Sequence, residues 1–259
     1  DIKLFKINLK DLWLFAAAGV FSIVLFNFSY YTTMSLTTLS VAAVLLYTAP
    51  FFVVIISLFL FGEKLSLAKS VALIVAFLGC CLVTGVFNDI SQIGGKAIVF
   101  GLLTGFGYAL YTVFSELLIR RGYKTLTITF YIFLMAAFGS LPFSNVSSLA
   151  PKLFGNGKTF LIVFLMAFLN TVLPYLFYTA GLRGVAPTTA PIIAAVEPVV
   201  ATIVGVAVFG EDIGIFGIVG IILVLFAVVL LNVSPLKLKA AAKINLVLSI
   251  DGKREDGYH

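Results

Sequence analysis

Eight long apolar stretches fill this chain between Leu12 and Val233, and nearly every charged residue falls between them. An α-helix needs about 20 apolar residues to cross the roughly 30 Å hydrocarbon core of a bilayer. Backbone groups in lipid must be hydrogen-bonded within the segment, so helices are the expected spanning element. With 61% hydrophobic and 11% charged residues and a mean hydropathy of +1.17, the sequence predicts an all-α, polytopic helical membrane protein. The expected spans are 12–33, 41–61, 68–87, 97–119, 125–143, 159–182, 188–209 and 213–233.

The basic residues predict the orientation of these spans. Eight spans place both ends of the stretch on the same side of the membrane. If that side is the cytoplasm, it receives 14 of the 17 Lys and Arg residues, and the opposite side receives only Lys96, Lys152 and Lys158. Such an asymmetry is what the positive-inside rule expects. We therefore expect a multi-pass protein of the inner (plasma) membrane with both ends cytoplasmic, and the net charge of +6 needs no nucleic-acid partner.

The chain also contains an internal repeat. Sliding the sequence along itself by 148 residues aligns two stretches without a gap. In both copies a proline lies in the middle of a span that ends in the letters FGE. Pro50 precedes the FGE at 61–63, and Pro198 precedes the FGE at 209–211. Chance matches among apolar residues would not readily produce this shared spacing.

The two copies are expected to cross the membrane in opposite senses, because five spans separate equivalent helices. Inverted repeats of this kind occur in many secondary transporters, whose substrate site lies near the midplane at the repeat interface. The second copy follows two spans, 97–119 and 125–143, that have no counterpart before the first copy. The symmetry therefore predicts two further helices upstream of Asp1, in a parent of ten helices arranged as two inverted five-helix repeats.

Two runs carry a resemblance to a known family. They are Ser40–Ser66, SVAAVLLYTAPFFVVIISLFLFGEKLS, and Thr188–Gly214, TTAPIIAAVEPVVATIVGVAVFGEDIG. Both resemble the proline-containing helix and G-E turn of the drug/metabolite transporter superfamily, which has paired EamA domains; the resemblance extends over about residues 10–234. It implies alternating access and the export or exchange of small metabolites such as amino acids, sugars or nucleotide-related compounds. On this basis residues 1–90 hold three helices of the first EamA repeat, and residues 91–235 hold the second repeat.

Glu197 is the most informative polar residue inside the expected spans. An ionised carboxylate at mid-membrane costs about 2.5–3.5 kcal/mol on insertion scales, so it should face the bundle interior or a wet cavity. One interpretation makes Glu197 a proton carrier or an anchor for a cationic group of the substrate. The alternative is structural: Glu197 would satisfy backbone groups disturbed at Pro198, or would pair with Arg183 to fasten two helices.

The two repeated prolines are candidates for helix kinks. Pro50 and Pro198 each lack a backbone donor, and discontinuous helices commonly border transporter sites. A packing kink without a role in transport is the alternative. Glu63 and Glu211 fall at span ends, where we expect turn or cap residues rather than substrate ligands.

Aromatic and amide side chains within the spans form the third candidate set. They could line a cavity for a small amphipathic metabolite, or could instead lie at the membrane interface or between helices. From this set and the carboxylate, we expect the substrate cavity to include Tyr47, Tyr108, Tyr111, Tyr178 and Glu197. We find no Walker loop, dinucleotide fingerprint or metal cluster in the spans, so no cofactor, metal or catalytic residue is expected. Proton coupling and a homodimer stay open.

The last 24 residues differ in composition from the spans. The run 242–259, AKINLVLSIDGKREDGYH, resembles the beginning of 4-diphosphocytidyl-2-C-methyl-D-erythritol kinase, a GHMP kinase. The phosphate loop and the acidic base of that family are absent from the run, so we expect no kinase activity in this chain. Three hypotheses follow: a transporter of a small metabolite, a membrane-tethered piece of a transporter–kinase fusion, and a scaffold that does not transport. Residues 236–259 would form a cytoplasmic tail.

Overall fold

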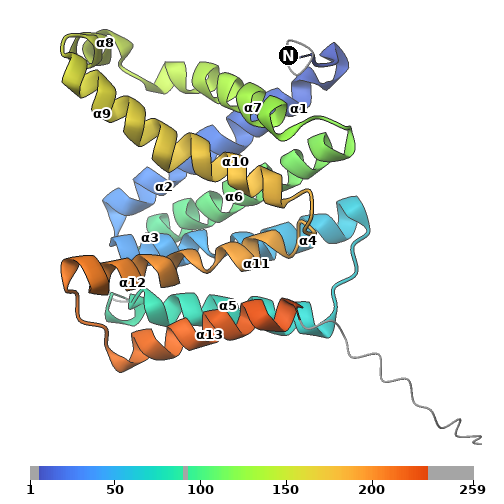
Figure 1. The fold of residues 1–259 in the computed structure, drawn as a ribbon, viewed down its shortest axis with the longest axis vertical. Helices are drawn as coiled ribbons and strands as arrows, with labels where there is room; N and C mark the ends of the chain where they lie inside the picture. The colour runs from blue at the N-terminus through green and yellow to red at the C-terminus, as the bar shows by residue number, and fades with distance from the viewer. Residues whose placement is uncertain (1–5, 90–92, 233–259) are drawn as a thin grey trace, which may run out of the picture.

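The structure is a computed structural model that describes residues 6–89 and 93–232, and all the regular structure within these residues is helical (Figure 1). The fold class expected from the sequence is therefore confirmed. Each of the eight expected spans is found as an apolar helical stretch. Six of them are long and apolar enough to cross a membrane: Leu9–Leu36, Leu39–Phe61, Gly95–Arg120, Thr125–Phe143, Gly157–Gly181 and Ala190–Phe209. The other two are the shorter helices α5 (Leu67–Val83) and α13 (Ile215–Asn232).

Four of the long stretches are interrupted, and the interruptions occur in pairs. The first stretch consists of η2 (Leu9–Asp11), α1 (Leu12–Ala17), a π-helical segment η3 (Ala18–Val24) and α2 (Leu25–Leu36). The second stretch is broken between α3 (Leu39–Leu46) and α4 (Ala49–Phe61). The stretch at 157–181 contains α9 (Gly157–Ala167), a second π-helical segment η7 (Phe168–Val172) and α10 (Leu173–Gly181). The last of the four is broken between α11 (Ala190–Ala194) and α12 (Glu197–Phe209). 

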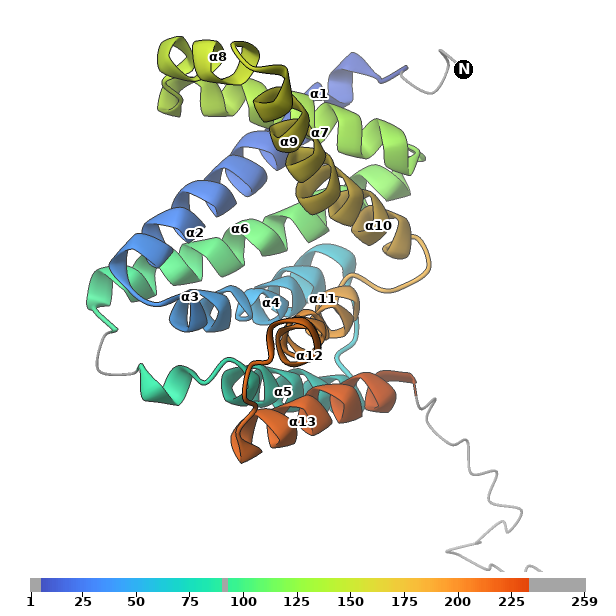
Figure 2. The same cartoon turned by 60° about the vertical axis from the view of Figure 1, so that its left-hand side comes forward.

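The remaining long helices are α6 (Gly95–Arg120) and α7 (Thr125–Ser140), which continues into the short η6 (Leu141–Phe143). Figures 1 and 2 show the helices stacked in a series, with α5 and α13 at one edge. Next come the two broken stretches α3–α4 and α11–α12, then α2 with α6, and finally α7 with α9 and α10. The two broken helices therefore lie in the interior of the stack.

One connection holds more structure than the sequence suggested. Residues 144–158 were expected to be a simple connector, but they contain helix α8 (Val146–Phe154). The Asn145 side chain accepts a hydrogen bond from the backbone N–H of Ser148 at 3.3 Å, which is an N-cap contact. Because Pro151 lies inside this short helix and Gly155 follows it, the stretch resembles a loop in sequence.

The backbone repeats its local geometry at positions 148 residues apart. The π-helical segments end at Val24 and Val172, and α5 and α13 begin at Leu67 and Ile215. The helices α4 and α12 end at left-handed glycines, with φ of +63° at Gly62 and +68° at Gly210. This conformation suits glycine because it has no Cβ.

Helices α5 and α13 pack side by side in opposite directions (Figure 1). A Cβ added to Gly79 would lie 2.7 Å from the Val224 side chain, and one added to Gly220 would lie 2.7 Å from the backbone nitrogen of Val83. Residue numbers thus rise along one helix as they fall along the other. Small residues let the two backbones approach closely, as is common between membrane helices. Antiparallel packing of equivalent helices is what inverted copies require.

Candidate functional site

The candidate site is a small pocket where the two broken stretches meet in the interior of the stack. It is lined mainly by residues on either side of each break, together with Tyr108 of α6 and Pro191 of α11: Leu46, Tyr47, Ala49, Pro50, Tyr108, Pro191, Ala194 and Glu197. Its volume is about 20 Å³, which is room for roughly one water molecule. In this conformation the pocket is therefore too narrow to hold a metabolite.

The lining of the pocket follows the repeat. Leu46 and Ala194 are 148 residues apart and end the first half of each broken helix, while Ala49 and Glu197 begin the second half. The pocket therefore lies where the pseudo-twofold axis that relates the two copies would pass. The backbone around it is nearly symmetric, but the side chains are not, because a carboxylate in one copy corresponds to a methyl group in the other.

The first break is held in place by a glycine on α6. A Cβ added to Gly105 would lie 3.1 Å from the backbone nitrogen of Ala49 and would also meet the Thr48 hydroxyl. That hydroxyl donates a hydrogen bond of 2.6 Å to the carbonyl of Leu45, at the end of α3. The close approach of α6 thus requires glycine at residue 105. Gly105 and Thr48 were not singled out from the sequence, although their small size at a helix contact was a usable signal.

Glu197 is the first residue of α12 and lines the pocket, and its side chain is exposed on one side. A carboxylate at a helix N-terminus interacts favourably with the helix dipole. The interpretation that Arg183 pairs with Glu197 is wrong. Arg183 instead donates hydrogen bonds to the Thr125 hydroxyl at 2.9 Å and to the Tyr123 carbonyl. Within residues 6–89 and 93–232, the carboxylate of Glu197 has no hydrogen-bond or ion-pair partner.

The expected aromatic residues divide into two groups. Tyr47 and Tyr108 line the pocket beside Glu197. Tyr178 lies behind Tyr108, with ring centres 5.6 Å apart, and its hydroxyl is 2.8 Å from the Thr112 hydroxyl. Tyr111 is buried, and its hydroxyl lies 2.6 Å from that of Thr179. Tyr111 and Tyr178 thus join α6 to α10 and stand outside the pocket lining.

The two repeated prolines begin helices in this structure. Pro50 is the second residue of α4, and Pro198 is the second residue of α12. Residues in the first turn of a helix have no intrahelical acceptor for their N–H groups, so proline removes no hydrogen bond there. Each proline therefore favours restarting the helix directly after the break.

Polar contacts join the two copies at the end of the bundle that carries most of the basic residues. The Thr188 hydroxyl donates to Glu63 Oε2 at 2.6 Å and accepts from Lys69 Nζ at 3.0 Å, and Lys69 Nζ is 3.9 Å from the same carboxylate oxygen. Nearby, the guanidinium of Arg120 lies 4.4 Å from the centre of the Phe61 ring. We call Glu63, Lys69 and Thr188 the polar latch. Glu63, which was expected to be a turn or cap residue, therefore also joins the first copy to the second.

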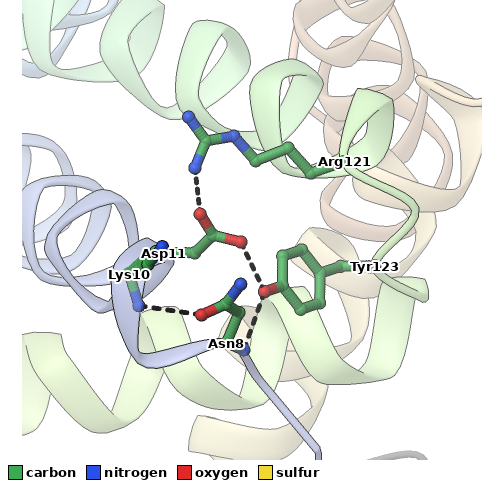
Figure 3. Close-up of polar contacts among 5 residues, drawn as sticks. All are labelled: Asn8, Lys10, Asp11, Arg121 and Tyr123. Atoms are coloured by element: carbon green, nitrogen blue, oxygen red, sulfur yellow. Dashed lines mark hydrogen bonds and ion pairs between the residues drawn. The ribbon is translucent and has the colours of Figure 1, made fainter.

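A second cluster at the same end fastens the start of the first stretch to the α6–α7 loop (Figure 3). Asp11 forms an ion pair with Arg121, and its other carboxylate oxygen accepts a hydrogen bond of 2.6 Å from the Tyr123 hydroxyl. That hydroxyl accepts a 3.0 Å hydrogen bond from the backbone N–H of Asn8. Burial and the bond to Asp11 raise the pKa of Tyr123 above its ordinary value. A tyrosine hydroxyl is already protonated near neutral pH, and the raised pKa extends the pH range in which this one donates to Asp11.

Two larger hollows, each of about 440 Å³, lie away from the breaks. One lies between α2 and α7 and includes Asn27, Tyr31 and Phe143; the other lies between α7 and α10 and includes Leu126 and Leu176. Neither lining contains a charged residue, and the walls are mostly apolar. Such surfaces suit contact with lipid tails. Among the described residues, no group of three His, Cys, Asp or Glu side chains is placed to hold a metal.

Comparison with known proteins identifies the family. A sequence profile of the EamA-like transporter family matches residues 1–85 and 95–233, which is most of the chain and includes both halves of the repeat. The chain belongs to the EamA-like transporter family. As a member of it, this is a membrane transporter, and the expected relation to the drug/metabolite transporter superfamily is confirmed.

Three relatives have transporter names. A protein of Archaeoglobus fulgidus called an uncharacterized transporter is 28% identical over 209 residues, covering 79% of this chain and 73% of its own length. A Clostridium kluyveri uncharacterized transporter is 24% identical over 87% of this chain and 74% of its own length. The uncharacterized transporter YxxF of Bacillus subtilis is 24% identical over 85% of this chain and 69% of its own length.

Among solved structures, a crystal structure of a protein shares the fold. It superposes with a TM-score of 0.69 at 16% sequence identity, covering 88% of this chain and 78% of the other. The kinase-like stretch 242–259 lies outside the described residues, and the family match ends at residue 233.

Proposed function

We propose that this chain is a secondary transporter that moves a small metabolite across the inner (plasma) membrane by alternating access. The observation that carries the proposal is the position of the central pocket, between two interrupted helices of oppositely directed copies. Interrupted helices related by inverted symmetry commonly form the substrate sites of secondary transporters near the bilayer midplane. Tyr47, Tyr108 and Glu197 would contact the substrate there.

In this proposal the narrow pocket belongs to a closed conformation. The polar latch and the contact between Arg120 and Phe61 join the first copy to the second at the basic end of the bundle. With the basic end in the cytoplasm, these contacts close the cytoplasmic path. Opening that path would require Thr188 to separate from Glu63 and Lys69 as the copies rock against each other.

A flux experiment tests the proposal. The purified protein is reconstituted into liposomes loaded with a defined mixture of amino acids, amines, organic acids, sugars and nucleosides, and the released solutes are identified by mass spectrometry. We expect at least one solute to be released faster than from protein-free liposomes, and unlabelled solute on the opposite side to accelerate its exchange. If no solute passes faster than through empty liposomes, the transport proposal is wrong and the scaffold hypothesis gains support.

A matched pair of variants connects flux to the site. Gly105→Leu places a bulky side chain against the break at Thr48 and Ala49, whereas Gly181→Leu lies where an added Cβ meets no atom within 4 Å. We expect a large loss of flux for the first variant and a small change for the second. Gel filtration in detergent checks that both variants are folded and not aggregated. Equal flux through the two variants would show that the transported solute does not pass by the break at Thr48 and Ala49.

A further inference from the structure

The central pocket combines one carboxylate with two aromatic rings. Glu197 is the single charged residue among the eight that line it, and Tyr47 and Tyr108 are the two aromatic residues of the lining. The other five are aliphatic or proline residues of the two broken stretches. The chemical character of the pocket is therefore set by these three side chains.

No basic side chain among residues 6–89 and 93–232 forms an ion pair with Glu197. The nearest basic residue along the sequence is Arg183, which bonds to Tyr123 and Thr125, and Lys69 of the polar latch bonds to Thr188. Pairing within the described residues thus leaves the Glu197 carboxylate available to a ligand. A charged side chain at membrane depth is costly and typically marks a substrate or ion path.

The repeat supports a ligand-related reason for the charge. Its counterpart Ala49 starts α4 in the same way that Glu197 starts α12, and both are followed by proline. The break before α4 and the proline that follows it form without a carboxylate at Ala49. A charge at Glu197 is therefore not required to form the equivalent break before α12. The structural alternative for Glu197, satisfying backbone groups at the break, therefore loses its main argument.

We propose that the pocket selects small organic ammonium compounds, with the cationic nitrogen against Glu197 and the apolar part of the molecule against Tyr47 and Tyr108. A carboxylate attracts an ammonium group strongly where water is excluded, and the face of an aromatic ring attracts it as well. Anions without an ammonium group would be repelled by the same carboxylate. This inference rests on the proposed transport function, because it names the substrate class of the same site.

A binding experiment with charge-matched pairs tests the inference. Choline is compared with 3,3-dimethylbutan-1-ol, which has nearly the same shape but no charge, and ethanolamine and tetramethylammonium are added as further ammonium probes. Binding to the full chain in detergent is measured from the ligand-dependent rise of the melting temperature. We expect at least one ammonium probe to bind about tenfold or more tightly than the neutral alcohol, which corresponds to one charge-assisted contact.

The variants separate the alternatives. Glu197→Gln keeps the size of the side chain but removes its charge, and we expect ammonium binding to weaken about tenfold or more. Glu211→Gln is the matched control at the far end of the same stretch, outside the pocket lining, and should bind as the wild type does. If Glu197→Gln binds ammonium probes normally but its flux loses pH dependence, Glu197 carries a proton instead and the inference is wrong.

Failure of this inference is distinguishable from failure of the transport function. Protein-dependent flux of neutral or anionic solutes alone would leave the transporter intact and overturn the ammonium class. Equal binding of choline and its neutral analogue, together with weak binding of the other ammonium probes, would do the same. Absence of all protein-dependent flux would instead remove the transport proposal.

Discussion

The stretches 9–36 and 157–181 are equivalent in the repeat, but they have very different surroundings. Both contain a π-helical segment at the corresponding place. In the first stretch Leu14 and Ala18 are fully buried against α6 and α7, while the corresponding Ile162 and Met166 are 47% and 60% exposed. The π-helical geometry is therefore present in both a buried and an exposed helix. This indicates that it depends on the local sequence rather than on packing against neighbouring helices.

The same comparison explains why the two halves of the pocket differ. Ala49 is buried because α6 lies against it at Gly105, whereas its counterpart Glu197 is exposed on one side. The charged residue thus lies at the more exposed of the two equivalent positions, and the small apolar residue lies at the tightly packed one. Burial of a carboxylate without a partner would be costly. The packing of each copy therefore determines which side chain can occupy the equivalent position.

The largest expected effect on stability tests the difference in burial between the stretches 9–36 and 157–181. Gly19 faces α7 so closely that an added Cβ would lie 2.7 Å from the backbone nitrogen of Ala136, while the equivalent Ala167 is exposed. We expect Gly19→Leu to cost about 1–3 kcal/mol through overpacking, and Ala167→Leu to change stability by about 0.5 kcal/mol or less. The melting temperature of the detergent-purified protein is the measurement. Equal losses would show that the face at Ala167 is covered in the folded protein.

A smaller effect is expected at the ends of α4 and α12. Glu63 accepts a short hydrogen bond from Thr188, whereas the exposed side chain of Glu211 has no hydrogen-bond or ion-pair partner in the part of the chain that the structure describes. Glu63→Gln should lower the stability by about 1–2 kcal/mol, because a charge-assisted hydrogen bond is weakened, and Glu211→Gln should have little effect. A double-mutant cycle of Glu63→Gln with Thr188→Val isolates the pair. Purely additive losses would contradict the polar latch.

The smallest effect is expected at the two prolines, and here the copies should agree. Pro50→Ala and Pro198→Ala each release the backbone at the first turn of a helix without restoring a missing intrahelical bond. We expect each to cost about 0.4–1 kcal/mol, chiefly through the greater freedom of the unfolded chain. Thermal melting again provides the measurement. A gain in stability in either variant would indicate that its proline strains the helix start.

The sequence predicted much of the fold because membrane burial leaves a simple signal. Apolar length located all eight spans to within a few residues, and the shared spacing of proline and FGE revealed two copies. Helix α8 was missed because Pro151 and Gly155 suggested a loop. The interruptions within the spans were missed in detail, because π-helical segments leave no clear pattern in hydropathy.

The candidate site was only partly predictable. Glu197 stood out because a charge at membrane depth is rare, and Tyr47 and Tyr108 because aromatic side chains within spans can line a cavity. Tyr111 and Tyr178 have the same residue type and similar positions within their spans, but the structure places both outside the pocket lining. Residue type alone does not distinguish a tyrosine that lines a cavity from one that joins two helices.

The sequence by itself determined that this chain crosses a membrane many times, which family it resembles and where its two copies align, because these properties depend on composition and spacing along the chain. The tertiary structure alone decided which residues meet across the repeat. It brought Glu197 beside Tyr47 and Tyr108, directed Arg183 to Tyr123 and Thr125, and joined Glu63 to Thr188. The physical reason is that such contacts depend on the rotation and approach of separate helices, which small residues such as Gly105 permit and which hydropathy does not record.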